Sequence, residues 1–80
     1  MRKGKRGWAE DLTQGIESAL KKDFPVEIIL HHDDQVSVAE KGLKKRARSM
    51  KRPYDHVAFR VLSESERVLL PIGTIRKRPT

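Results

Sequence analysis

Seven lysine and arginine residues lie between positions 41 and 52, and no carboxylate interrupts them. Ammonium and guanidinium groups bind the phosphate oxygens of nucleic acids, and each such contact releases counterions. The eleven basic residues elsewhere are matched by eleven acidic residues, so this run alone accounts for the formal net charge of +7. An uncompensated cationic run of this kind predicts contact with a polyanion.

The run is predicted to lie on a helix over residues 38–52. Its apolar residues recur at helical spacing and would share one side: Ala39, Leu43, Ala47 and Met50. The other side would carry the candidate nucleic-acid-binding residues Lys41, Lys44, Lys45, Arg48, Lys51 and Arg52. Ser37 and Glu40 form a capping-box pattern at the start of this helix, and Pro53 marks its end because proline cannot donate to the helical ladder. One side would thus pack against the protein, and the other would face solvent.

Three more residues extend the candidate site beyond the helix. Tyr54 follows the run and could stack on an unpaired base, although a tyrosine at this position also suits the edge of a core. Arg76 and Lys77 lie where the chain passes into a basic tail, residues 77–80, and residues 1–7 are predicted to be a flexible basic arm. Tails of this type either extend a nucleic-acid footprint or keep a protein in solution.

Two other functions are compatible with the same residues. The first is a protein-interaction module or inhibitor, phage-encoded ones included, whose basic helix occupies an acidic or nucleic-acid-binding groove of a partner protein. The second is a small ribonuclease that uses His56 and Tyr54 in acid-base chemistry. No flanking motif specifies such a catalytic site, and aromatic residues are few. We therefore expect a non-enzymatic protein that binds duplex DNA or structured RNA.

A metal site is the remaining chemical hypothesis. The side chains of His31, His32, Asp33 and Asp34 are of the types that ligate zinc or magnesium. Adjacent residues of a strand point to opposite faces, so the two imidazoles would not easily share one ion. The chain also has no cysteine and no glycine-rich phosphate loop. We therefore predict no metal site and no cofactor.

The size and hydropathy of the chain set the class of protein. Eighty residues make one domain near the lower limit for a single core. No uninterrupted apolar run approaches the length of a membrane span. With a pI near 10.2, the composition predicts a cytoplasmic protein without a membrane partner, and it leaves the oligomeric state open.

Hydrophobic periodicity predicts five elements that would position the candidate residues. They are a helix over 8–22, a strand over 26–31, the basic helix, and strands over 56–62 and 67–76. The last two would flank the polar loop 63–66 as a C-terminal β-hairpin, with Val61 opposite Val68. Gly15 would lower the stability of the first helix only slightly, through its low helix propensity. The predicted class is α+β, close to α/β, in the order α-β-α-β-β, with a three-stranded mixed sheet covered by two helices in one domain at residues 8–76.

Overall fold

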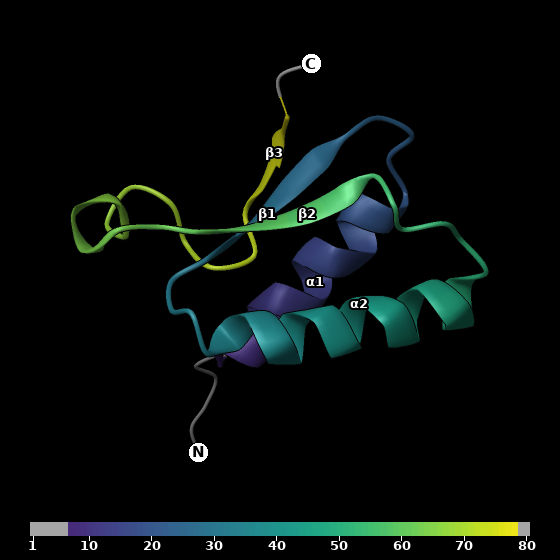
Figure 1. Cartoon of the computed structure of the whole chain (residues 1–80), viewed down its shortest axis with the longest axis horizontal. Coiled ribbons are helices and arrows are strands. Elements are labelled where there is room, and N and C mark those ends of the chain that lie inside the picture. Colours follow the sequence, from purple (N-terminus) through teal and green to yellow (C-terminus); the bar gives the residue numbers. More distant parts are fainter. Residues whose placement is uncertain (1–6, 79–80) are drawn as a thin grey trace.

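Both helices pack against the same face of a three-stranded sheet in the computed structural model of the chain (Figure 1). The structure describes residues 7–78, so most of the predicted flexible arm and the end of the basic tail lie outside the described residues. The elements are helices α1 (Trp8–Leu20) and α2 (Gln35–Met50), strands β1 (Val26–Leu30), β2 (Val57–Val61) and β3 (Ile75–Lys77), and the short 3-10 helix η1 (Glu64–Glu66). The predicted class, with two helices and a three-stranded mixed sheet, is confirmed.

The central strand of the sheet is β1, and the strand order is β2-β1-β3. It runs parallel to β2, with Val26 opposite Val57 and Leu30 opposite Val61. It runs antiparallel to β3, with Ile28 opposite Ile75. Parallel neighbours need a crossover connection, and α2 supplies it between β1 and β2.

The predicted C-terminal hairpin is wrong, because β3 pairs with β1 and not with β2. Of the predicted strand over 67–76, only Ile75 and Arg76 lie in a strand, and β3 extends one residue further to Lys77. Val68, the predicted partner of Val61, is 87% exposed. The apolar composition of residues 67–74 suited a strand, but among residues 7–78 the strand that pairs with β2 is β1.

The connection from β2 to β3 is fixed by its own hydrogen bonds. At η1, the Ser63 hydroxyl (2.9 Å) and amide (3.2 Å) both donate to Oε1 of Glu66. These bonds, chiefly the one from the hydroxyl, hold the pKa of Glu66 below its usual value. Further along, Ile29 N–H donates to the Thr74 carbonyl and Gly73 N–H donates to the Ile29 carbonyl, both at 2.9 Å. This second pair of bonds brings the chain back to β1.

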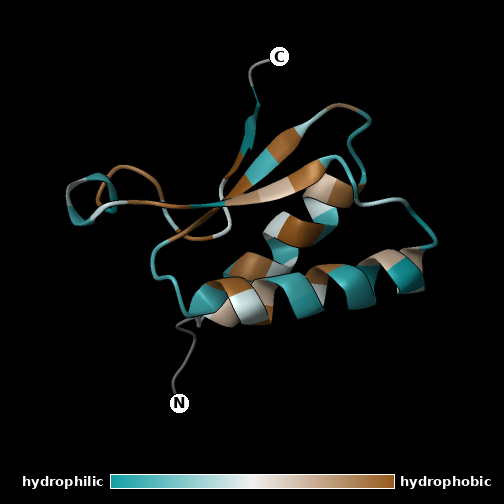
Figure 2. Ribbon diagram, in the orientation of Figure 1, coloured by the Kyte–Doolittle hydropathy of each residue, from teal (hydrophilic) through white to brown (hydrophobic). Residues whose placement is uncertain are grey.

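One apolar cluster joins the sheet to both helices (Figure 2). Val26, Ile28 and Leu30 alternate along β1 and are at most 2% exposed. They belong to the same cluster as the buried helix residues Leu12, Ile16, Ala19 and Leu20 of α1 and Ala39, Leu43 and Ala47 of α2. The apolar side predicted for the basic helix is thus the side that packs against the protein, and the opposite side is left to solvent.

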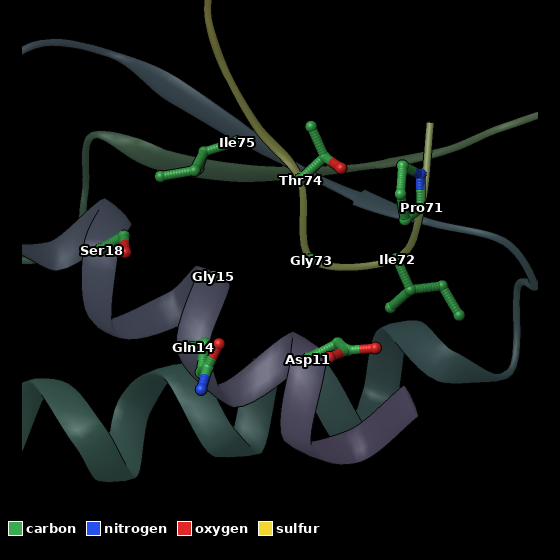
Figure 3. A pocket seen from close by; sticks show the side chains of 9 residues that line it. All are labelled: Asp11, Gln14, Gly15, Ser18, Pro71, Ile72, Gly73, Thr74 and Ile75. Carbon is green, nitrogen blue, oxygen red and sulfur yellow. The ribbon is translucent and has the colours of Figure 1, made fainter. Parts of the chain in front are cut away.

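A direct backbone contact places α1 against the turn that precedes β3 (Figure 3). A Cβ at Gly15 would overlap the carbonyl oxygen of Gly73, and a Cβ at Gly73 would overlap the carbonyl oxygen of Asp11. Gly73 also has a φ of 89°, in a turn closed by the hydrogen bond from Thr74 N–H to the Pro71 carbonyl. Gly15 is therefore a packing requirement, which its helix propensity alone did not predict.

A buried glutamine fixes the start of α2. The helix begins at Gln35, two residues before Ser37, and Ser37 is exposed inside the first turn, so the predicted capping box is wrong. Gln35 is 7% exposed. Its Oε1 accepts hydrogen bonds from the backbone N–H groups of His31 (2.9 Å) and His32 (3.0 Å). One side chain therefore joins the end of β1 to the beginning of α2.

Replacing Gln35 by leucine is expected to lower the free energy of unfolding by about 2 kcal/mol, because two partly buried amides lose their acceptor. Urea unfolding followed by circular dichroism measures the change. Gln14→Leu, at an exposed position of α1, is the matched control and should change the free energy of unfolding by less than about 0.5 kcal/mol. Equal effects of the two substitutions would contradict the role assigned to Gln35.

Candidate nucleic-acid interface

Four basic side chains share the solvent side of α2, and we call them the basic face: Lys41, Lys44, Lys45 and Arg48. All four are exposed. With 3.6 residues per turn, they fall within an arc of about 100° that lies opposite the buried side of the helix. The hydrophilic side of α2 is turned away from the sheet in Figure 2. These four cations therefore point in a common direction, as the sequence predicted.

None of the four side chains is neutralised by the part of the chain that the structure describes. Among residues 7–78, no carboxylate oxygen lies within 4.0 Å of a nitrogen of the basic face. Arg46 differs, because its Nη1 lies 3.4 Å from Oε2 of Glu17 on α1. Like charges three and four residues apart repel one another on a helix. An anionic partner would relieve this repulsion.

The C-terminus of α2 continues the cationic surface. The helix ends at Met50, two residues before the predicted end, and Lys51 adopts the left-handed conformation with φ 57° and ψ 47°. Lys51 N–H donates to the Arg48 carbonyl (3.3 Å), and Arg52 N–H donates to the Ala47 carbonyl (3.0 Å). This pair of bonds is a Schellman motif. Lys51 and Arg52 are both exposed immediately beyond the basic face.

Tyr54 lies beside a hollow between α2 and β2. The residue is 39% exposed, and the hollow has a volume of about 420 Å³. Lys44 of the basic face lines the same hollow, as do the apolar side chain of Leu43 and the carboxylates of Glu40 and Asp55. The structure thus brings Tyr54 next to one candidate residue, in surroundings that are partly apolar and partly acidic.

Arg76 and Lys77 belong to a different surface. They lie on β3, which forms the edge of the sheet opposite β2, whereas α2 contacts β2. Arg76 is directly opposite Glu27 of β1. The Nζ of Lys77 lies 5.3 Å from the centroid of the Phe24 ring, within range of a cation-π interaction. The structure does not bring these two residues together with the basic face.

His31, a candidate metal ligand, and His56, a candidate ribonuclease residue, are both hydrogen-bonded to backbone carbonyls. The Nε2 of His56 donates to the Ala19 carbonyl (3.0 Å), and the Nε2 of His31 donates to the Leu70 carbonyl (2.7 Å). A carbonyl only accepts, so Nε2 carries the proton in both rings. Only Nδ1 of His56 is then left for the acid-base role of the ribonuclease hypothesis. Within residues 7–78, no three His, Asp or Glu side chains gather as metal ligands.

A second hollow lies between α1 and α2 beside the basic face, and only its α2 side could be inferred from the sequence, from the small residues Gly42 and Ser49. It has a volume of about 410 Å³ and is lined by Thr13, Ile16, Gly42, Lys45, Arg46 and Ser49. Small residues next to basic ones on α2 were the available signal. The contribution of α1 depends on how the two helices pack, which periodicity does not determine.

No family model, curated protein or solved structure matches the chain. Within residues 7–78, no helix combines the length and the apolar composition needed to cross a lipid bilayer. The basic face and the two hollows that border it are the features of the described residues that bear on function.

Proposed function

We propose that the protein binds the phosphate backbone of duplex DNA or structured RNA through the basic face of α2. The observation that carries this proposal is the alignment of four exposed cations that have no carboxylate partner among residues 7–78. A structural helix of this length would usually interleave acidic and basic residues to gain i,i+4 pairs. Phosphates provide the missing counter-charges, and Lys51 and Arg52 extend the footprint beyond the helix.

The proposed binding is non-enzymatic and tolerant of sequence. From Lys41 to Arg48 the helix rises about 10 Å, which corresponds to roughly three phosphate-to-phosphate steps, and hence four phosphates, along one strand of B-DNA. The outward residues of the basic face are lysines and one arginine, which suit phosphates, and no asparagine or glutamine lies among them to read an adenine edge. Affinity would therefore come from charge and shape more than from base contacts.

A protein partner is the second candidate, and the hollow between α2 and β2 favours it. Leu43, Val57 and Phe59 give this hollow an apolar lining next to Lys44. Apolar contact beside charge is typical of protein interfaces. In this alternative, the basic helix would occupy an acidic groove of the partner. Pull-down from lysate with and without nuclease treatment separates direct protein partners from partners bridged by nucleic acid.

The test of the first candidate is a titration at several salt concentrations. Fluorescence anisotropy with a DNA duplex, an RNA hairpin and a single strand should show the tightest binding to one of the two structured ligands. Four phosphate contacts predict that log Kd changes with log salt concentration with a slope of about 4 in magnitude on B-DNA. Weak binding to all three ligands without salt dependence would exclude the proposal.

A further inference from the structure

The two hollows that border the basic face differ in chemistry. The one on the β2 side carries the carboxylates of Glu40 and Asp55 together with apolar side chains. The one on the α1 side is lined by the cations of Lys45 and Arg46, and none of its lining residues among positions 7–78 is a carboxylate. A phosphodiester that approaches α2 would be repelled on the first side and attracted on the second. The charge distribution thus favours a nucleic-acid backbone that lies on the α1 side of the basic face.

The groove between α1 and α2 is open because of the residues at its base. Gly42 has no side chain, and a Cβ there would already lie 3.5 Å from Cδ1 of Ile16 across the groove. A methyl group would therefore fit in ordinary contact, whereas a larger side chain would fill the space. The Thr13 hydroxyl donates its hydrogen to the Ala9 carbonyl (2.8 Å) and is not available as a donor.

Three groups at the groove can donate hydrogen bonds to an anion. They are the ammonium of Lys45, the guanidinium of Arg46 and the hydroxyl of Ser49. Arg46 is held by a single contact of 3.4 Å to Glu17, and the two side chains are 45% and 39% exposed. An ion pair this long and this exposed is weak. A phosphate can compete for Arg46, whose planar fork also suits bidentate contact with phosphate oxygens.

We propose that one phosphodiester of the bound nucleic acid lies in the groove between α1 and α2, held by Lys45, Arg46 and Ser49. This inference rests on the proposed function and assigns an orientation to it. The backbone crosses from the basic face toward α1 and away from β2. Glu17 is the competing anion, so the strength of binding depends on how readily Arg46 exchanges one anionic partner for the other.

Filling the groove tests the inference without changing any charge. Gly42→Leu is expected to weaken binding to the duplex or hairpin about tenfold and to reduce the magnitude of the salt slope by about one, as the loss of one phosphate contact would. Gly42→Ala is the matched control, because its methyl group leaves the groove open, and it should bind within about twofold of the wild type. Circular dichroism shows whether both variants are folded.

A second pair of variants tests the role of Arg46 without adding bulk. Glu17, on α1, is half-exposed, and Glu40, on α2, is exposed. Glu17→Gln and Glu40→Gln each remove one carboxylate, so they raise the net charge equally. Of these two glutamates, Glu17 is the one that forms an ion pair with Arg46. Glu17→Gln should therefore tighten binding about three- to fivefold. Glu40→Gln removes only repulsion on the β2 side and should tighten binding by the smaller factor of about two.

The outcomes separate this inference from the function on which it rests. If Gly42→Leu binds as Gly42→Ala does, or if the two glutamate variants bind alike, while wild-type binding is steeply salt-dependent, the groove is empty and the basic face alone is the site. If the wild type itself binds without salt dependence, the proposed function fails first. Should Gly42→Leu not fold, the comparison of the two glutamate variants decides.

Discussion

Replacing Lys44 and Arg48 together by glutamate is expected to weaken binding to duplex DNA or an RNA hairpin on the order of a thousandfold near 0.1 M salt. Two phosphate contacts are lost, and two carboxylates then face the same phosphates. Both side chains are exposed and unpaired among residues 7–78, so the fold should be unaffected. Anisotropy titration measures the affinity, and a thermal melt followed by circular dichroism verifies the fold.

The control for this variant changes the same number of charges elsewhere. Lys21 and Lys22 are exposed where α1 ends, away from the basic face along the chain. Replacing both by glutamate alters the net charge equally but should weaken binding only several-fold, through the long-range field. Equal losses in the two variants would mean that net charge, and not the basic face, governs binding.

Alanine at Gly73 is expected to have the largest effect on stability, a loss of about 3 kcal/mol or more. The added Cβ would overlap the Asp11 carbonyl, and a φ of 89° is unfavourable for any residue with a side chain. Alanine at Gly15 would overlap the Gly73 carbonyl and should cost a similar amount. A domain of this size has a free energy of unfolding of roughly 4–12 kcal/mol, so either variant approaches the limit of folding.

Gly42→Ala is the matched control for both glycine variants. Like Gly15→Ala, it is a substitution within a helix, but its methyl group would meet Ile16 at an ordinary contact distance of 3.5 Å. Because alanine has the higher helix propensity, this variant should be more stable by up to about 1 kcal/mol. Urea unfolding compares the three proteins, and a stabilising effect of Gly15→Ala would contradict the packing described for α1.

The sequence predicted the elements whose signal is local. Helical periodicity identified both helices, and the β-branched run after Pro25 identified β1. The pairing of the last strand could not be predicted in this way, because two apolar segments with a consistent register fit a hairpin as well as a crossover. The deciding features were distant contacts: the approach of Gly73 to α1 and its hydrogen bond to Ile29.

In the candidate site, too, the features that depend on local sequence were predictable, and those that depend on contacts between elements were not. The direction of each side chain on α2 follows from its position in the sequence, so the basic face could be predicted from spacing alone. The pairing of Arg46 with Glu17 could not, because it depends on the packing of α1 beside α2. The same limit applies to Arg76 and Lys77, which are basic like the others but lie on the strand at the far edge of the sheet.

The backbone of Lys51, the residue that follows α2, is in the left-handed conformation. Glycine adopts that backbone conformation without steric cost, whereas a residue with a side chain gives up about 1 kcal/mol or more there. Steric cost alone would thus favour glycine at the end of α2, whereas the ammonium group of Lys51 interacts favourably with the C-terminal end of the helix dipole. Under the proposed function, the same group also places a cation next to the phosphates, immediately beyond the basic face.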